Sequence, residues 1–271
     1  MYRGFNLSLD PYLRSFVDEA SYGREFMASE WPRVEPDLTQ LAKKDRIDGD
    51  MIMQDWFRKI DADVFISHSH ADEAMALGLA GYLNKEFGLR SFVDSMVWSN
   101  CNDLLRTFDD QHCLDKISNT YIYNRRNYST SHVHMMLASS LTQVIDKAEC
   151  IIFLNTPASI QVSDAESLAD EKVASPWIYH ELTISRLIRK RKPKRLLAKL
   201  RESLEHRASA MDMDDMPTFQ YKAPLDHLAK IDWPDIANWL TRFKKEGIHR
   251  PAPAALDVLY EMIDDSPFDA D

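Results

Sequence analysis

Three short apolar runs alternate with helical patterns along the middle of the chain. Residues 63–67 (DVFIS), 89–94 (LRSFVD) and 150–155 (CIIFLN) are rich in β-branched and aromatic side chains, which is typical of strands buried on both faces of a parallel sheet. Between the first two runs, apolar side chains at every fourth position predict a helix that ends at Gly88. These positions are Met75, Leu79, Leu83 and Phe87. Strand, helix and strand in this order form a right-handed unit with parallel strands.

Further helical patterns lie on either side of the third apolar run. A stripe of apolar and small side chains from Val133 to Ala148 predicts one helix. Ser175 followed by Pro176 is typical of the start of another, with serine as the N-cap. A third helix is predicted over residues 232–243, and residues 219–225 (FQYKAPL) are a candidate fourth strand. The chain is therefore predicted to be an α/β protein with a doubly wound, flavodoxin-like parallel sheet.

The same patterns divide the chain into three parts. Residues 1–60 mix aromatic and charged side chains in short amphipathic segments, and we expect a helical N-terminal extension that packs on the main domain. The main domain is predicted over residues 61–245, with an insertion at about residues 95–130 that reads as a loop, a helix and an irregular segment. Residues 246–271 are expected to form a C-terminal tail.

Composition and charge argue against several classes of function. The 271 residues include only 7 glycines, and neither a Walker A motif nor a GxGxxG motif is present, so a glycine-rich phosphate loop is not expected. The net charge of −10 has the wrong sign for a dedicated nucleic-acid-binding protein. We therefore interpret the basic run at residues 186–195 as a solvated helix end, where cations are favoured by the helix dipole.

Cysteine usage and the distribution of apolar residues favour a cytoplasmic protein. Cys101, Cys113 and Cys150 are odd in number and widely spaced, so no disulfide framework is indicated. The first ten residues contain no apolar signal core, and no run approaches the ~18 apolar residues that a membrane helix needs. We therefore expect neither secretion nor insertion into a membrane.

The predicted topology gathers polar side chains at one edge of the sheet. Ligands of doubly wound proteins bind at the carboxyl ends of the strands. The candidate binding residues that follow the first two strands are Ser67, His68, His70, Asp94 and Trp98. For Asp94 we favour a structural role, in which it orients the following loop through backbone hydrogen bonds. Ser69 is expected to cap the helix that follows.

Three segments together resemble the TIR (Toll/interleukin-1 receptor) domain family. Residues 63–72 (DVFISHSHAD) are similar to its first strand and the loop after it, and residues 89–98 (LRSFVDSMVW) to its second strand and BB loop. Residues 175–182 (SPWIYHEL) are similar to a box on its third helix, with Trp177 and Glu181 in a W-xxx-E arrangement. The resemblance covers residues 60–190 well and 215–245 weakly. The insertion and the first 60 residues depart from the family pattern.

The resemblance implies an enzyme that cleaves the nicotinamide–ribose bond of NAD⁺, with Glu181 as the catalytic residue. Loss of nicotinamide builds positive charge on the ribose, as in glycoside cleavage, and a nearby carboxylate stabilises that charge. Nicotinamide leaves as a neutral molecule, so no general acid is needed. Trp177, four residues before Glu181, lies on the same helix face and is expected to form a wall of the pocket. NAD⁺ is a substrate here, and we expect no cofactor and no metal.

Resemblance to stand-alone bacterial antiphage TIR proteins, including the Thoeris type, implies a role in defence signalling. The product would be a cyclic ADP-ribose-type messenger that is sensed by a separate effector. The implied partners are NAD⁺, that effector and further copies of the chain bound through TIR surfaces. No nucleic acid and no membrane are expected as partners.

Other interpretations remain open at this level. Glu181 alone is also compatible with a solvated helix carboxylate, and Trp177 with a core position. A non-catalytic TIR adaptor, or an N-glycosidase related to nucleoside deoxyribosyltransferases, would use the same elements. The histidine pairs invite a metal hypothesis, but His132 and His134 point about 200° apart on a helix and cannot bind one ion together.

The insertion carries aromatic and basic side chains directly after the predicted BB loop. They are Tyr121, Tyr123, Arg125, Arg126 and Tyr128. One interpretation places them on the rim of the pocket, where tyrosine hydroxyls and arginine guanidinium groups bind the diphosphate or adenine of NAD⁺. The other is a surface insertion packed on residues 1–60.

Overall fold

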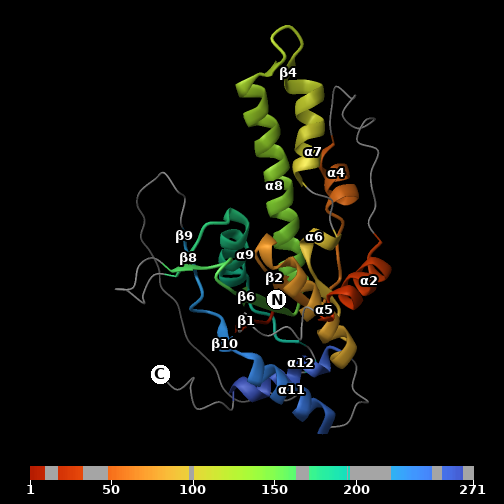
Figure 1. The fold of residues 1–271 in the computed structure, drawn as a ribbon, viewed down its shortest axis with the longest axis vertical. Helices are drawn as coiled ribbons and strands as arrows, with labels where there is room; N and C mark the ends of the chain where they lie inside the picture. The colour runs from red at the N-terminus through yellow and green to blue at the C-terminus, as the bar shows by residue number, and fades with distance from the viewer. Residues whose placement is uncertain are drawn as a thin grey trace.

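A five-stranded parallel sheet forms the centre of the protein (Figure 1). The computed structural model describes residues 1–9, 18–32, 48–97, 101–162, 171–193, 195, 221–245 and 252–264. In spatial order the strands are β10 (Ala229–Ile231), β1 (Arg3–Ser8), β6 (Cys150–Asn155), β2 (Val64–Ser67) and β3 (Ser91–Phe92). Every neighbouring pair is parallel. The prediction of a doubly wound α/β fold is confirmed.

The described part of the chain also contains nine α-helices and two small antiparallel sheets. The helices are α2 (Ala20–Glu30), α4 (Gly49–Trp56), α5 (Glu73–Phe87), α6 (Asp94–Val97), α7 (Cys101–Phe108), α8 (Tyr123–Lys147), α9 (Pro176–Leu187), α11 (Trp233–Lys245) and α12 (Ala254–Asp264). One small sheet pairs β4 (Leu114–Asp115) with β5 (Thr120–Tyr121), and the other joins β7 (Gln161–Val162), β8 (Glu171–Val173) and β9 (Tyr221–Lys222). None of the described helices is long and apolar enough to cross a membrane.

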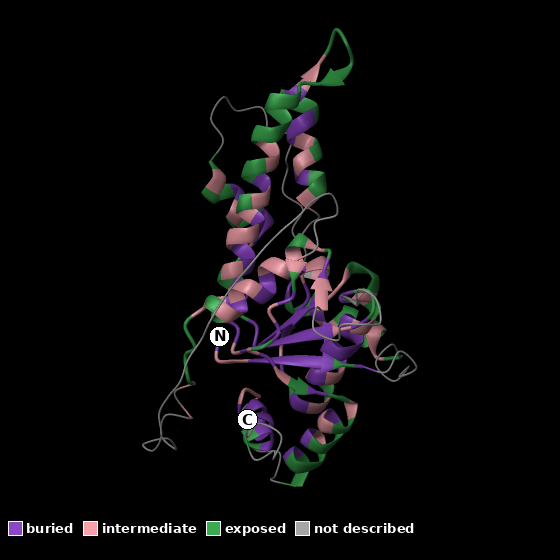
Figure 2. Cartoon of the chain, turned by 90° about the vertical axis from the view of Figure 1, so that its left-hand side faces the viewer, coloured by how far each residue is buried: buried purple, intermediate pink, exposed green. Residues whose placement is uncertain are grey.

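Helices cover both faces of the central sheet. Phe5 of β1 stacks on Tyr260 of α12, with ring centroids 6.2 Å apart, so α12 packs on the face to which Phe5 points. The register places Phe5 beside Ile152 and Ile152 beside Ile66. Ser67 is the next residue after Ile66 and points to the opposite face, where its hydroxyl meets α9. Figure 2 shows the buried strands between helical layers.

The N-terminal strand corrects the prediction of a purely helical extension. Arg3–Ser8 lies between β6 and β10, in the interior of the sheet, and Phe5 and Leu7 are fully buried. The segment RGFNLS escaped the sequence analysis because Gly4 and Asn6 interrupt its apolar positions. A Cβ atom at Gly4 would meet the side chain of Leu228 and lie 2.9 Å from Cγ2 of Ile151, so these side chains would have to shift to accept it. The proposed boundary at residue 60 therefore does not separate an extension from the sheet.

The C-terminal part of the chain also differs from the prediction. In the described part of the candidate strand at residues 219–225, which begins at residue 221, the strand is Tyr221–Lys222, and it belongs to a small antiparallel sheet. The fifth strand of the main sheet is instead Ala229–Ile231. The expected tail contains α12, whose side chains are buried almost all round, as in a helix enclosed by a core.

Several local predictions are confirmed. The Ser175 hydroxyl accepts a hydrogen bond from the Ile178 amide, and Pro176 opens α9. Gly88 ends α5 with φ of 69°, a left-handed conformation that favours glycine. The predicted helix at residues 232–243 is α11, which buries Ile236, Trp239 and Phe243.

The insertion forms a projecting arm, which we define as residues 101–135. It consists of α7, a π-helical turn (Asp109–Cys113), the β4–β5 hairpin and the first half of α8. Figures 1 and 2 show the arm extending well beyond the sheet. Helix α8 begins at Tyr123, ten residues before the predicted stripe, and its 25 residues span about 37 Å at 1.5 Å per residue.

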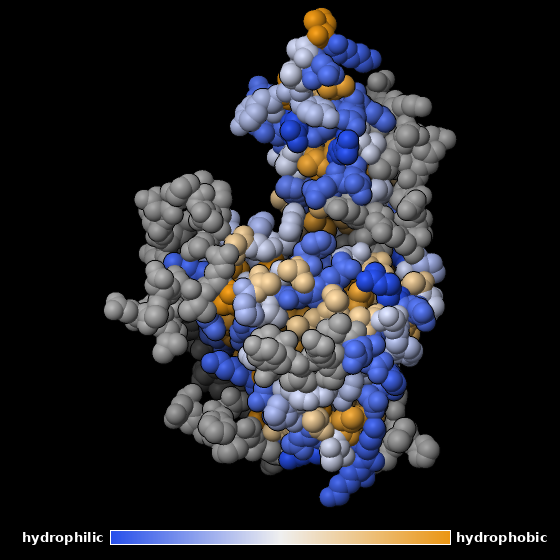
Figure 3. Space-filling view, in the orientation of Figure 1, coloured by the Kyte–Doolittle hydropathy of each residue, from blue (hydrophilic) through white to orange (hydrophobic). Residues whose placement is uncertain are grey.

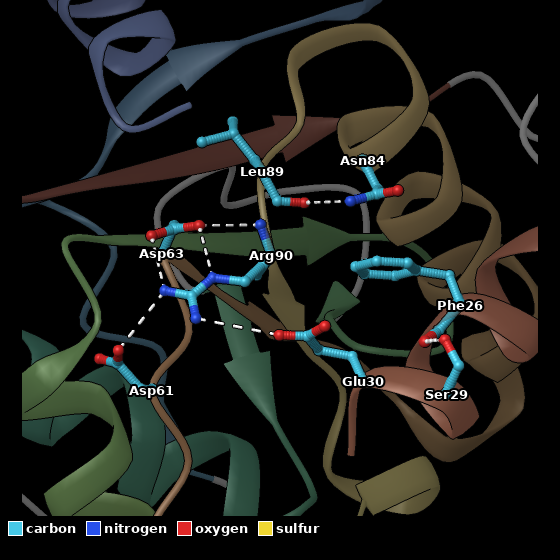
Figure 4. A network of polar contacts seen from close by, with 8 residues as sticks. All are labelled: Phe26, Ser29, Glu30, Asp61, Asp63, Asn84, Leu89 and Arg90. Carbon is cyan, nitrogen blue, oxygen red and sulfur yellow. Dashed lines mark hydrogen bonds and ion pairs between the residues drawn. The ribbon is translucent and has the colours of Figure 1, made fainter. Parts of the chain in front are cut away.

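An ion-pair network fastens α2 to one edge of the sheet (Figure 4). The Asp63 carboxylate accepts hydrogen bonds from the Arg90 backbone amide at 2.9 Å and from its Nε atom at 3.4 Å. The same guanidinium lies 4.0 Å from Glu30 of α2 and 3.5 Å from Asp61. The hydrogen bond to Asp63 raises the pKa of Arg90, so this cation stays charged and holds the three carboxylates together.

Candidate active site at the end of strand β2

Helix α9 brings Glu181 to the carboxyl end of β2. The Ser67 hydroxyl donates a hydrogen bond to Oε2 of Glu181 at 2.6 Å. Ser67 is 1% exposed and Glu181 is 5% exposed. Glu181 lies on the buried face of α9 beside Ile178 and Leu182, and the Ser175–Pro176 start fixes where that face begins. Two residues 114 positions apart in the sequence, both predicted for the site, are thus in direct contact.

The surroundings of Glu181 oppose its ionisation. Burial raises the pKa of Glu181 well above its usual value, and the nearby Asp94 carboxylate raises it further. The hydrogen bond from Ser67 acts in the other direction, because it favours the ionised form. Glu181 therefore keeps its proton to a higher pH than an ordinary glutamate, as active-site acids often do.

Asp94 lies next to Ser67 across the sheet edge. Phe65 of β2 pairs with Phe92 of β3, and Ser67 and Asp94 each follow two residues later. Oδ1 of Asp94 accepts a hydrogen bond from the Ser95 amide at 2.8 Å, at the start of α6. This contact is the backbone role that the sequence favoured for Asp94.

The loop after β2 holds the two candidate histidines at the same edge. His68 is half-buried, with Nδ1 3.3 Å from the Ile66 carbonyl oxygen. His70 is exposed and begins a short 3₁₀ turn (His70–Asp72). The Ser69 hydroxyl accepts a hydrogen bond from the Ala71 amide at 3.4 Å. Ser69 thus caps this 3₁₀ turn and not α5, whose N-cap is Asp72. Neither His68 nor His70 contacts Glu181 through a hydrogen bond.

A contact that sequence reasoning missed joins this loop to the one after β6. The Asp72 carboxylate accepts hydrogen bonds from the Thr156 hydroxyl at 2.6 Å and from the Ser159 hydroxyl at 3.4 Å. Asp72 thus ties two loops at the carboxyl edge instead of completing a capping box with Ser69. The available signal was the position of Thr156 directly after the predicted strand at residues 150–155.

Trp177 and its neighbours lock α9 against α8. The Trp177 ring is half-buried and meets the His134 ring edge-on, with centroids 5.3 Å apart. One turn later, Nε2 of His180 lies 3.2 Å from the Thr142 hydroxyl. Trp177 therefore packs between α9 and α8, four residues before Glu181. His134 serves this packing, and within the described residues no three His, Cys, Asp or Glu side chains converge as a metal site.

Asn6 adds an unexpected polar group to the same face of the sheet. The register places Asn6 beside Phe153 and Phe153 beside Ser67, so the three side chains form one row across β1, β6 and β2. Asn6 is 3% exposed, and its Oδ1 atom has no hydrogen-bond partner. Such an atom is uncommon in a folded interior and marks a candidate functional position.

The insertion side chains do not lie on the rim of this site. His134 marks the level of Trp177 along α8, and Arg125 is nine residues nearer the tip, about 13 Å further out. Arg126 pairs with the buried Asp109 at 2.9 Å, and Arg125 donates to the His112 carbonyl oxygen at 3.3 Å. These contacts favour the interpretation of a surface insertion over the one in which these arginines bind the NAD⁺ diphosphate at the strand ends. Trp98 lies outside the described residues.

Much of the basic run at residues 186–195 is paired within the protein. Arg186 lies 3.0 Å from Asp226, Arg191 pairs with Asp146, and Arg195 pairs with Glu149 and Asp257. These ion pairs favour the structural interpretation of the run over a nucleic-acid patch.

Comparisons with known proteins identify no relative: no family model, no curated protein and no solved structure matches the chain.

Proposed function

We propose that the protein is a TIR-like enzyme that cleaves the nicotinamide–ribose bond of NAD⁺, with Glu181 as the catalytic residue. The observation that carries this proposal is the 2.6 Å contact between Ser67 and Glu181. It joins the segment that resembles the first TIR strand to the segment that resembles the W-xxx-E helix. The buried, hydrogen-bonded carboxyl group argues against the solvated interpretation of Glu181.

The protonation state of Glu181 supports a role tied to a cationic substrate. In the free protein, burial and Asp94 hold the pKa of Glu181 high. The nicotinamide ring of NAD⁺ is positively charged, and an opposite charge close by favours the carboxylate. Substrate binding would therefore release the proton to solvent and create the negative charge next to the ribose. That charge stabilises the developing oxocarbenium-like cation in a site from which water is excluded.

The other candidate residues take binding roles in this proposal. Ser67 orients the carboxylate, His68 and His70 face the ligand from the loop after β2, and Trp177 forms the wall toward α8. NAD⁺ is the substrate and no resident cofactor is invoked. We further propose that the product is a cyclic ADP-ribose-type signal for a separate effector in antiphage defence, as the TIR resemblance implies.

The test is incubation of the purified protein with NAD⁺, with nicotinamide release as the assay and mass spectrometry to separate linear from cyclised ADP-ribose. Glu181→Gln keeps the shape but cannot carry the charge, and it should lower the rate by on the order of 10²–10³. Glu25→Gln, on the exposed side of α2, is the matched control and should keep the wild-type rate.

Two outcomes would overturn the proposal. If folded wild-type protein released no nicotinamide at either low or high protein concentration, the non-catalytic adaptor would be favoured. A sugar covalently trapped on Glu181 would favour an N-glycosidase of the deoxyribosyltransferase type, because that chemistry uses a nucleophilic carboxylate.

A further inference from the structure

The outer face of α8 carries a seam of exposed and half-buried side chains. At its outer end Arg125 donates to the His112 carbonyl oxygen, and at its inner end His132, Met135 and Ser139 border α4. The members of the seam follow one another at alternating intervals of three and four residues. They are Arg125, Tyr128, His132, Met135 and Ser139. Tyr128 is 70% exposed and Met135 is 66% exposed. The buried positions of the helix, such as Val133, Leu137 and Leu141, lie on a different face. A 3–4 spacing of this kind is the pattern of a helix that packs along a second helix.

Exposed apolar side chains are concentrated on the arm. Of the nine large apolar or aromatic side chains that are exposed in the described part of the chain, six lie between Ile117 and Met135. They are Ile117, Tyr121, Ile122, Tyr123, Tyr128 and Met135. Figure 3 shows apolar groups at the surface of the arm among hydrophilic ones. A cluster of this kind on a projecting element marks an interaction surface.

A groove lies beside the inner half of the seam, between α4 and α8. Its volume is about 420 Å³, and Met53 of α4 with Met135 and Met136 of α8 supply its apolar lining. Asp48 and Asp50, both exposed, form its acidic side. Methionine side chains adapt to the shape of an inserted ring, so the groove suits an aromatic side chain that arrives together with a cation.

The outer half of the seam has the complementary chemistry. Tyr128 and Arg125 lie toward the tip of the arm, and residues 116–145 contain no Asp or Glu at all, although the chain has 43 of them. Positions along α8 are also symmetric about His132 once the groove residue Met136 is counted with the seam. Arg125 lies seven residues before His132 and Ser139 seven after it, and Tyr128 and Met136 lie four residues away on either side.

We propose that two copies of this chain pair through antiparallel α8 helices, with a two-fold axis at His132. The symmetry then places Tyr128 of each copy in the methionine groove of the other, and Arg125 of each beside Asp48 and Asp50 of the other. A two-fold interface requires one surface to hold both complementary halves, and this seam does so at matching spacings. A copy of the chain is therefore a better occupant than an unrelated acidic protein, which would leave the groove unfilled. The pairing is independent of the NAD⁺ reaction.

The first test is the mass of the full-length protein in solution by light scattering and sedimentation, from about 1 to 100 µM. We expect a concentration-dependent dimer, and Tyr128→Glu should raise its dissociation constant by about 30-fold or more, as for a central aromatic contact. Leu187→Glu is the matched control, since Leu187 is 72% exposed but lies on α9. Circular dichroism confirms that each variant is folded.

A charge swap tests the ionic contact across the interface. Arg125→Glu and Asp50→Lys should each weaken the dimer, and the double variant should regain affinity.

The second test locates the axis. With glutathione disulfide as the oxidant, His132→Cys should form a disulfide-linked dimer, because only a residue at a two-fold axis meets its own copy. Ser139→Cys should not, since the two copies would lie far apart along the antiparallel helices. A wild-type protein that stays monomeric up to 100 µM would overturn the proposal. So would a dimer that Tyr128→Glu leaves intact, or one that cross-links through position 139 and not through position 132.

Discussion

At the scale of single residues, the candidate site depends on a carboxyl group that the fold stabilises in its neutral form. Glu181 combines burial, a neighbouring Asp94 and one hydrogen bond from Ser67. Burial and Asp94 disfavour the charge, and only the hydrogen bond favours it. When Glu181 is ionised, it lowers the stability of the folded protein. Such a residue is retained where function needs it, because activity and stability then make opposite demands on the same side chain.

This conflict predicts how Glu181→Gln changes stability with pH. Because the pKa of Glu181 is higher in the folded than in the unfolded protein, the folded state binds the extra proton from about pH 4.3 up to the raised pKa. The contribution of Glu181 to the free energy of unfolding of the wild-type protein is therefore largest below about pH 4.3, and it decreases as the pH rises through that window. Glutamine is neutral throughout, so the melting temperature of the variant should exceed that of wild type by more at pH 8 than at pH 5.

The measurement is thermal unfolding of both proteins at pH 5 and pH 8, with Glu25→Gln as the control for a lost surface charge. A variant that is less stable than wild type at pH 8 would show that Glu181 is charged and well solvated in the folded protein. Activity and stability should therefore move in opposite directions in Glu181→Gln.

The sequence predicted the members of the site better than it predicted their arrangement. Ser67 could be found because it ends a strand with a clear apolar pattern, and Glu181 because the helix that carries it resembles the W-xxx-E box of the TIR family. Asn6 could not, because its place in the row with Ser67 depends on the register of β1 against β6. The contact of Asp72 with Thr156 was missed for the same reason, since the loops meet only after the strands are ordered.

At the scale of elements, predictability followed the strength of the local pattern. The strand Cys150–Asn155 was predicted with its correct bounds, because CIIFLN is an unbroken apolar run. Strand β1 and helix α12 were missed. Asn6 and Gly4 interrupt the first. The second carries Asp257, Glu261 and Asp264 at helical spacing, and it was missed because residues 246–271 were interpreted as a tail. Long-range packing, through the stacking of Phe5 on Tyr260, defines both elements together.

The crossing of α2 and α5 depends on two glycines that the sequence does not single out. A Cβ on Gly81 would lie 2.7 Å from the Glu19 carbonyl oxygen and 2.9 Å from the Gly23 amide nitrogen, and a Cβ on Gly23 would collide with the Leu77 carbonyl oxygen. These are backbone atoms, so the helices would have to separate. Gly81→Ala and Gly23→Ala should each lower the free energy of unfolding by about 1–3 kcal/mol, although alanine favours helix formation.

The control is Gly49→Ala, because no atom lies within 4 Å of the added methyl group at that position in α4. It should be neutral or slightly stabilising. Urea unfolding of the three variants distinguishes the close crossing from general helix propensity. Equal stability of all three proteins would mean that α2 and α5 do not pack this tightly in solution.

At the scale of the whole molecule, one helix links the sheet to the surface proposed for pairing. From His134 onward, α8 packs on α9 through His134, Ala138 and Thr142. Its first half forms the arm, where Arg126 and Ser129 hold the buried Asp109. The arm is thereby anchored by polar contacts of its own, and the site at the end of β2 lies on the sheet side of the same helix. Changes at the tip should therefore leave the sheet and the site intact.

This separation predicts opposite results for a truncation of the N-terminus and a shortening of the arm's tip. Removing residues 1–9 takes away β1, which pairs with both β6 and β10 and buries Phe5 and Leu7 completely. Two strands would lose their shared neighbour, and each would expose an unpaired edge, so the product should be insoluble or unfolded.

Replacing residues 115–120 by Asn-Gly removes only the exposed tip and joins Leu114 to Tyr121, which already pair, through a two-residue hairpin turn. That variant should melt within about 2 °C of wild type. Soluble yield, circular dichroism and thermal unfolding measure both outcomes. A folded protein without residues 1–9 would restore the view of this segment as a dispensable extension, whereas a large loss of stability on shortening the tip would show that the arm and the sheet fold as one unit.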